Sequence, residues 1–138
     1  MNCAFEDCTC FLELLDRYGT VCSDLFCEFE RARKANTDSI ADLALENFVE
    51  MRDRVADPQF LFQKKVELAL QARYPRLFVP KYSMVTFHRI PYSVAQSRGK
   101  IQDRLLTELC DSVSRIEDLD WQKAEKLIHG NLTPLEDL

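Results

Sequence analysis

Asn47 and Glu50 are the polar residues whose spacing suggests binding chemistry most directly. The apolar residues around them repeat every three or four positions, which predicts an amphipathic helix: Ile40, Leu43, Ala44, Phe48 and Met51. Asn47 falls inside that stripe, where a buried amide costs about 1 to 3 kcal/mol unless its hydrogen bonds are met. Glu50 lies three residues later on the same face, so the pair could bind an amine, an amide or a carboxylate. Spacing alone favours a simpler arrangement, in which Asn47 bonds a neighbouring loop and Glu50 pairs with Arg54.

Tyr82 is a third polar residue with a possible binding role. It alternates with Met84 and Thr86 in a segment rich in β-branched and aromatic residues, so its phenol could donate to a ligand carboxylate from a partly apolar wall. Taken by itself, the pattern is more typical of a tyrosine used for packing.

Cysteine and histidine residues make a weaker case for chemistry. The chain has six cysteines, and without a secretion signal we interpret them as reduced thiols that pack as small apolar residues. Cys8 and Cys10 with Cys3 lack the paired spacing of a zinc knuckle, and His88 lies far from His129, so a structural metal is not expected. Glycine-rich phosphate loops and nucleophile-elbow motifs do not occur in the sequence. The residues alone therefore predict no catalytic group.

Helical spacing and helix-end signals predict five to six helices that would position these side chains. We expect them at about residues 5–18, 20–36, 37–51, 57–73, 93–113 and 121–130. Gly19 should end the first in a left-handed conformation, Asp57 and Ser93 should cap later ones, and Gly99 weakens its helix by about 1 kcal/mol relative to alanine. Residues 77–88 follow Pro75, contain Pro80 and should form one extended segment. The predicted fold is an all-α bundle, with one domain over residues 1–131 and a loose tail at 132–138.

Composition narrows the class of protein. Hydrophobic residues make up 46% of the chain and charged residues 30%, which is typical of a folded domain. The net charge is -5 with mixed signs along the sequence, so nucleic acid is not an expected partner. No apolar run approaches the roughly 18 to 20 residues that cross a bilayer, and no signal peptide begins the chain, so we expect a cytoplasmic protein without a membrane anchor.

Several short strings, in the same order, resemble kynurenine 3-monooxygenases, chiefly the bacterial ones. They are MNCAFEDC at 1–8, RKAN at 33–36, IADLALENF at 40–48, EMRD at 50–53, DP at 57–58, FLFQKK at 60–65, FVPKYSMVTF at 78–87 and GKIQ at 99–102. The resemblance extends from residue 1 to about residue 110. It implies the helical C-terminal part of a flavoprotein that uses FAD and NADPH to hydroxylate L-kynurenine at its 3-position, in tryptophan degradation and NAD biosynthesis.

The resemblance also implies specific site residues. Asn47, Glu50 and Tyr82 match the family's substrate-binding positions, and Met51 would form a pocket wall. Met1 and Asn2 match the start of a motif that lies beside the flavin ring, so residues 1–8 would be what remains of the flavin-contacting motif. Cys3 stands where the family usually has alanine.

The family's Rossmann-type FAD-binding portion, with its glycine-rich fingerprint, has no counterpart in the sequence. We therefore expect the chain by itself to retain neither FAD nor NADPH and not to hydroxylate kynurenine without a complementary FAD-binding half. Helices that normally cover a flavin domain should also expose apolar surface, which favours self-association.

Two other functions fit the sequence. The chain could be a non-catalytic helical module that binds a protein partner or a small aromatic acid through the face that bears Asn47, Glu50 and Tyr82. It could also be a cysteine-based metal or redox module, an interpretation that depends only on the number of cysteines and on Cys8 and Cys10.

Overall fold

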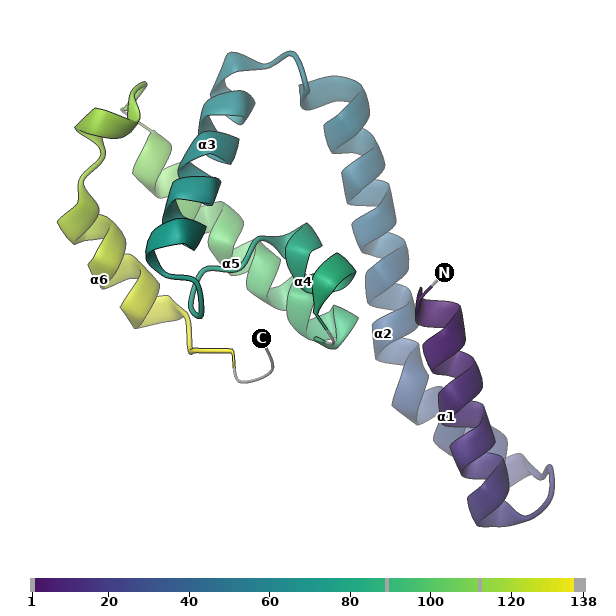
Figure 1. Ribbon diagram of the computed structural model, residues 1–138. Helices are drawn as coiled ribbons and strands as arrows, with labels where there is room; N and C mark the ends of the chain where they lie inside the picture. Colours follow the sequence, from purple (N-terminus) through teal and green to yellow (C-terminus); the bar gives the residue numbers. More distant parts are fainter. Residues whose placement is uncertain (1, 89, 112, 136–138) are drawn as a thin grey trace.

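The computed structural model describes residues 2–88, 90–111 and 113–135, and within them the fold is all-α, as predicted (Figure 1). These residues form six α-helices, one π-helical turn (η1) and one 3₁₀ turn (η2), and they contain no strand. The elements in chain order are α1 (Asn2–Tyr18), α2 (Ser23–Val49), η1 (Glu50–Arg54), α3 (Pro58–Arg73), α4 (Lys81–Phe87), α5 (Tyr92–Cys110), η2 (Ile116–Asp118) and α6 (Trp121–Asn131).

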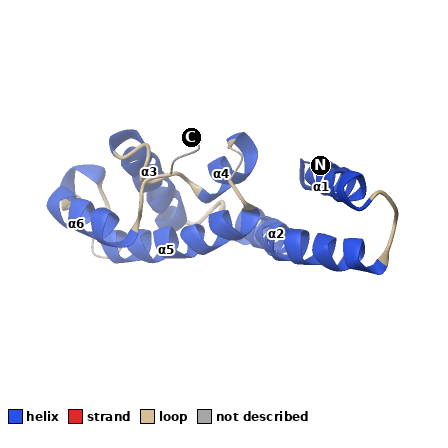
Figure 2. Ribbon diagram, turned by 90° about the horizontal axis from the view of Figure 1, so that it is seen from below, coloured by secondary structure: helices blue, strands red, loops and turns tan. Residues whose placement is uncertain are grey.

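Helix α5 is the element around which the others assemble. It contacts α2, α3, α4 and α6, whereas α1 packs along α2. Figures 1 and 2 both show α1 and the first part of α2 projecting away from α3, α5 and α6. Within the described residues, none of the helices combines the length and the apolar character that a bilayer crossing requires.

Two apolar clusters hold these helices together. The larger one joins α3, α5 and α6 and consists of Val66, Leu70, Phe78, Leu105, Leu106, Leu109, Cys110, Leu119, Ala124, Ile128 and Leu132. The smaller one joins α4 to the start of α5 and consists of Val79, Met84, Ile90 and Ala95. Removing these side chains from water is the main stabilising contribution, at roughly 25 cal/mol for each Å² of apolar surface buried.

The predicted break between two helices near Asn36 is wrong, because α2 continues through it to Val49. The side chain of Asn36 does not cap a helix; its Oδ1 accepts from the backbone N–H of Ser93 at 3.1 Å and from the Ser93 hydroxyl at 3.0 Å. The Thr37 hydroxyl donates to the carbonyl of Lys34 at 3.0 Å, within the same helix. Polar residues that resemble a helix boundary in sequence are therefore satisfied inside the helix and across to α5.

The extended segment predicted at residues 77–88 is only partly correct, because residues 81–87 form the short helix α4. Residues 78–80 have no regular structure, and the carbonyl of Val79 accepts from Gln102 Nε2 at 2.9 Å. Pro80 then precedes the first helical residue, with a φ of -52° that suits this place. β-branched and aromatic residues favour strands only where a neighbouring strand gives them a surface, and here Met84 packs against α5 instead.

Two predicted helix ends are confirmed and one is wrong. Gly19 has a φ of 69° and follows the last residue of α1, and the Asp57 side chain accepts from the N–H of Gln59 at 2.9 Å at the start of α3. Ser93 does not cap α5, which begins at Tyr92 after Pro91. The hydroxyl of Ser93 is used instead to join α5 to Asn36 of α2.

Residues 132–135, which the sequence predicts as part of a loose tail, run against the rest of the fold. Leu132 is buried, and the carbonyl of Thr133 accepts from Arg98 Nη2 at 2.6 Å. The N–H of Leu135 donates to the carbonyl of Arg76 at 2.9 Å. Residues 136–138 of the predicted tail lie outside the described residues.

Candidate functional site

A buried lysine with three carboxylates lies where α2, η1, α4 and α5 meet. Lys81, the first residue of α4, places its Nζ 3.0 Å from Glu46 Oε2, 3.4 Å from Glu50 Oε1 and 3.7 Å from Asp103 Oδ2. Its side chain is only 7% exposed. The partners come from residues up to 57 positions apart in the chain, so the cluster exists only when these elements pack together.

The charge of Lys81 is strongly favoured in this setting. Burial by itself lowers the pKa of Lys81, but Asp103, Glu46 and Glu50 outweigh it and hold the pKa well above its usual range. Within the described residues, no group of three or more His, Cys, Asp or Glu side chains is arranged to hold a metal ion. The Lys81 ammonium neutralises the carboxylates of Glu46, Glu50 and Asp103, which would repel one another without it.

Gly99 of α5 makes room for the Lys81 side chain. A Cβ placed at Gly99 would lie 2.7 Å from Lys81 Cδ, 3.0 Å from Cγ and 3.3 Å from Cβ. The 2.7 Å separation is shorter than carbon atoms tolerate and the other two are tight, so any larger residue would shift the aliphatic stem of the lysine away from α5. The helix-weakening glycine noted in the sequence thus has a packing role.

Tyr82 lies beside this cluster. The Lys81 Nζ is 5.2 Å from the centre of the Tyr82 ring, a cation–π distance. The Tyr82 hydroxyl oxygen is buried and has no hydrogen-bond partner among the described residues. Burial is the main reason that the pKa of Tyr82 rises to about 12, although Lys81 acts in the opposite direction. The phenol therefore stays protonated and keeps an unused donor.

Glu50 is held by Lys81 and not by Arg54. It begins the π-helical turn η1, and its side chain is 17% exposed. The pairing with Arg54 that spacing favoured is wrong, because the Arg54 guanidinium lies over the Phe60 ring at 6.0 Å from its centre. A π-helical turn changes the direction of side chains relative to an α-helix, and such turns often occur at functional sites. Here the turn begins at the residue that faces Lys81.

The ion cluster borders a cavity of about 470 Å³. Leu45 and Val49 supply apolar wall, and charged groups supply the rest: Glu46, Glu50, Arg54, Lys81 and Asp103. A smaller cavity of about 120 Å³ adjoins it, with Glu50, Arg54 and Asp103 in both linings and Phe60 and Leu106 in the second. The volume and the mixed lining suit a small polar ligand with an apolar part.

Asn47 and Met51 are exposed on the same stretch of chain. The expectation that Asn47 is buried in an apolar stripe is wrong, because Leu43 is buried but Phe48 and Met51 are 59% and 62% exposed. The partly buried carboxylates on this stretch are Glu46 of α2 and Glu50 of η1, which face Lys81 of α4. The structure therefore brings Glu50 and Tyr82 to one cluster through Lys81, while Asn47 and Met51 face solvent.

Of the two predicted flavin contacts, only Asn2, the first residue of α1, is among the described residues. Met1 falls outside the described residues, and Asn2 is exposed. Asn2 lines a cavity of about 270 Å³ together with residues of the other end of α4, namely Val85, Thr86, Phe87 and His88. Helix α4 thus has the Lys81 cluster at its first residue and the Asn2 cavity at its last.

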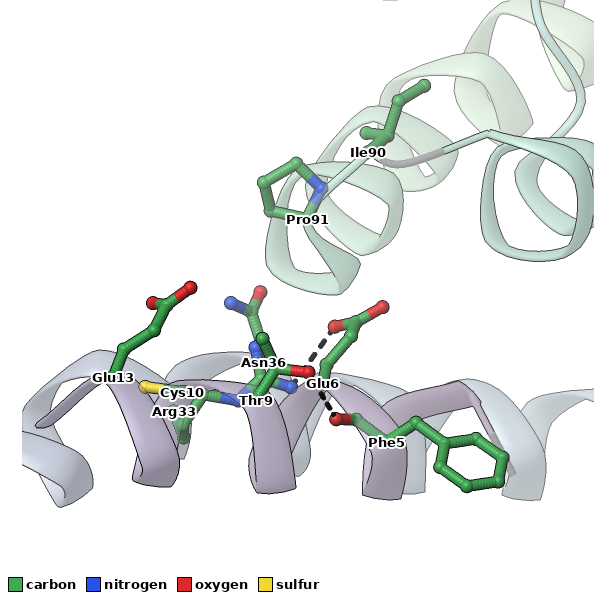
Figure 3. A pocket seen from close by; sticks show the side chains of 9 residues that line it. All are labelled: Phe5, Glu6, Thr9, Cys10, Glu13, Arg33, Asn36, Ile90 and Pro91. Atoms are coloured by element: carbon green, nitrogen blue, oxygen red, sulfur yellow. Dashed lines mark hydrogen bonds and ion pairs between the residues drawn. The ribbon is translucent and has the colours of Figure 1, made fainter. Parts of the chain in front are cut away.

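A further cavity, of about 530 Å³, lies between the paired helices α1 and α2 and the start of α5 (Figure 3). Two of its charged groups, Arg33 and Glu6, are paired at 3.1 Å. Arg33 also donates to Asp7 at 2.6 Å, and Tyr92 donates to Glu6 at 2.9 Å. Burial and the hydrogen bond to Glu6 raise the pKa of Tyr92 to about 12. These contacts fasten α1 to α2 and α5.

Sequence reasoning missed Lys81, Glu46 and Asp103. One signal was available, because Lys81 is the single charged residue in the run FVPKYSMVTF, where a lysine must find partners or reach solvent. The six cysteines, in contrast, are free and scattered over α1, the start of α2 and the end of α5.

Comparison with known proteins finds no matching family model but clear relatives. A kynurenine 3-monooxygenase of Myxococcus xanthus is 47% identical over 134 residues, which are 97% of this chain and 29% of the relative. Proteins of the same name from Xanthomonas oryzae and Xanthomonas campestris are 47% and 46% identical over 136 residues, which are 99% of this chain and 30% of each relative. The chain therefore spans about 30% of the length of the curated relatives it matches.

Proposed function

The chain is homologous to part of kynurenine 3-monooxygenase, and from this we propose that it forms the C-terminal, substrate-side part of an FAD- and NADPH-dependent monooxygenase. The reaction of the whole enzyme is the hydroxylation of L-kynurenine to 3-hydroxykynurenine, in tryptophan degradation and NAD biosynthesis. The observation that carries the proposal is the buried hydroxyl of Tyr82, which has no partner among the described residues and lies beside the cluster that holds Glu50.

A buried hydroxyl without a hydrogen-bond partner calls for an explanation, because leaving a buried donor unpaired costs about 1 to 3 kcal/mol. A ligand carboxylate or carbonyl that accepts from Tyr82 would remove the penalty. The Tyr74 hydroxyl is also buried without a partner, but the aromatic contact of its ring is with His129 of α6 and not with the ion cluster. Only the hydroxyl of Tyr82 combines this condition with a neighbouring carboxylate site, among the residues that the structure describes.

In this proposal Glu50 and Tyr82 supply the fixed polar contacts to the substrate. The carboxylate of Glu50 accepts from an amino group, and the phenol of Tyr82 donates to an oxygen of the ligand. Asn47 and Met51 supply an amide and an apolar wall at the exposed side, where bound substrate or another part of the enzyme would cover them. Tyr82 and Glu50 orient the ligand, and neither transfers a proton in the reaction.

The described residues do not by themselves fit a flavin. Asn2 and the end of α4 line a cavity of about 270 Å³, below the roughly 300 to 1,000 Å³ usual for ligands much smaller than FAD. Bound FAD, reduced by NADPH, would supply the oxygen-transfer chemistry. We therefore propose that this chain alone retains no FAD and is inactive without a complementary FAD-binding half. Purified protein incubated with FAD and then desalted should show no visible flavin absorbance, and retained flavin would contradict this part of the proposal.

Binding of L-kynurenine to the purified chain tests the substrate-side proposal. Isothermal titration calorimetry should show saturable binding to the wild type and at least about tenfold weaker binding to Tyr82→Phe, which removes one hydrogen bond to a charged group. Tyr92→Phe is the matched control. The Tyr92 hydroxyl is already bonded to Glu6, so we expect its removal to leave kynurenine affinity unchanged. No binding by the wild type, or equal affinity of Tyr82→Phe, would contradict the proposal.

One observation favours a second function, a non-catalytic helical module that binds a protein partner. Large apolar side chains are exposed along the end of α2 and η1: Leu45, Phe48, Val49, Met51 and Val55. Clusters of exposed apolar residues often mark protein interaction sites. Light scattering that shows self-association, together with no kynurenine binding, would favour this module over the substrate-side part of a monooxygenase.

A further inference from the structure

Lys81 has no role in the proposed function, yet it contacts the residues that carry it. Its Nζ lies 3.4 Å from Glu50 Oε1 and 5.2 Å from the centre of the Tyr82 ring. We infer that Lys81 is a positioning residue, which fixes the Glu50 carboxylate beside the cavity from a place that Gly99 creates. The inference rests on the proposed function, because Lys81 would position the carboxylate with which Glu50 contacts the ligand.

Lys81 is the group that restrains Glu50. Among the described residues, the Glu50 side chain makes one ion pair, in which Lys81 Nζ also donates a hydrogen bond to Glu50 Oε1 at 3.4 Å. Without that ammonium the side chain would be free to rotate towards solvent at the open side of the cavity. Ligand affinity is lower when the Glu50 side chain must be ordered on binding, because the side chain then loses rotamer entropy.

Lys81 is itself anchored without Glu50. Glu46 of α2 and Asp103 of α5 approach the same ammonium at 3.0 and 3.7 Å. Asp103 is largely exposed, so its attraction is weakened by solvent, and Glu46 is the closer partner. The lysine can therefore remain in place when a ligand contacts Glu50, as a positioning residue must.

Helix α5 provides the space for the lysine stem. Gly99 lies in the interior of α5, where glycine is less favourable than alanine by about 0.8 to 1.0 kcal/mol. Its missing Cβ is the space that Lys81 Cγ and Cδ occupy. A Cβ added at Gly130 of α6 would meet nothing within 4 Å, so the other helical glycine does not make room for a neighbouring side chain.

The test compares substitutions that remove, keep or displace the ammonium. Lys81→Met keeps an unbranched stem without charge, and Lys81→Arg keeps the charge. The control is Lys123→Met, which removes the cation of an exposed ion pair with Glu108. We expect L-kynurenine affinity to fall at least about tenfold in Lys81→Met, to recover to within a few-fold in Lys81→Arg, and to be unchanged in Lys123→Met. A Lys81→Met protein that folds and binds as tightly as the wild type overturns the inference.

A second measurement needs no ligand and separates this inference from the proposed function. The carboxyl carbon resonance of Glu50, assigned with Glu50→Gln, should shift in Lys81→Met and in Gly99→Ala but not in Lys123→Met or Gly130→Ala. A wild type that fails to bind kynurenine, with a Glu50 resonance that shifts as expected, removes the proposed function and keeps Lys81 as the group that holds Glu50. A resonance that does not move when Lys81 is changed or displaced overturns the inference, whether or not kynurenine binds. Gly99→Ala retains every charge, so it decides the question if Lys81→Met does not fold.

Discussion

Replacing Gly99 with alanine separates the packing role of this residue from ordinary helix preference. Gly99 lies inside α5 at a negative φ, so helix propensity alone favours Gly99→Ala by about 1 kcal/mol. The new Cβ would lie 2.7 Å from Lys81 Cδ and 3.0 Å from Cγ, and overpacking of this kind costs about 1 to 3 kcal/mol. The expected net change in the free energy of unfolding is therefore between about zero and a loss of 2 kcal/mol.

Gly130→Ala is the matched control for this substitution. Gly130 also lies in a helix, and a Cβ added there meets nothing within 4 Å. We expect this variant to gain some fraction of about 1 kcal/mol, because Gly130 is next to the end of α6. Urea unfolding, followed by circular dichroism, measures both variants against the wild type. Equal stabilisation of the two variants would refute the packing argument.

A double-mutant cycle identifies Lys81 as the cause. Lys81→Ala removes Cγ and Cδ, the two atoms nearest the added Cβ, and leaves only the Lys81 Cβ contact at 3.3 Å. In that background Gly99→Ala should change sign and become stabilising, which gives an interaction energy of about 1 to 3 kcal/mol. An unchanged effect of Gly99→Ala in the Lys81→Ala background would place the strain elsewhere in α5.

Four further substitutions test the ionisable and hydroxyl groups. Tyr82→Phe removes a buried hydroxyl without a partner, so thermal unfolding should show stability equal to the wild type or higher by about 1 kcal/mol, whereas Tyr92→Phe should lose about 1 kcal/mol. Burial raises the pKa of Glu67 despite its pairing with Lys64, so the folded state disfavours the charge. Glu67→Gln should therefore be more stable than the wild type at about pH 7, and the difference should vanish as pH falls below the unfolded value near 4.5, because both side chains are then neutral. Arg33→Met removes a largely buried cation from two partly exposed carboxylates, and we expect a loss of about 1 to 3 kcal/mol and faster proteolysis between α1 and α2.

The elements that the sequence predicts correctly are those whose signals are local. Asp57 before Pro58 sets the start of α3, because its side chain accepts a hydrogen bond from the N–H of Gln59, two residues later. Gly19 ends α1 through its own positive φ. The all-α class follows from helical spacing along most of the chain. Each of these features depends on residues within one or two helical turns, which is the range that a pattern can describe.

The errors come from contacts between distant residues. Asn36 resembles a cap in sequence, but its partner is Ser93, 57 residues away, so α2 does not end there. Residues 81–87 have the composition of a strand and form a helix, because Met84 finds α5 to pack against and not a second strand. The apolar spacing around Asn47 does not reveal that Glu46 of α2 and Glu50 of η1 are partly buried, since that depends on Lys81 approaching from α4.

The placement of α4 links the stability of the fold to the candidate binding site. Helix α4 has seven residues, too few to be stable alone, so its position depends on Met84 and on the hydrogen bond from Gln102 Nε2 to the carbonyl of Val79. Lys81 and Tyr82 are the first two residues of this helix, and they follow Val79 after one proline. A change at Gln102, which is buried in α5, would therefore move both residues relative to Glu50. The site is held by a core contact as much as by its own charges, because the ammonium of Lys81 reaches the carboxylates of α2 and η1 only while α4 stays seated on α5.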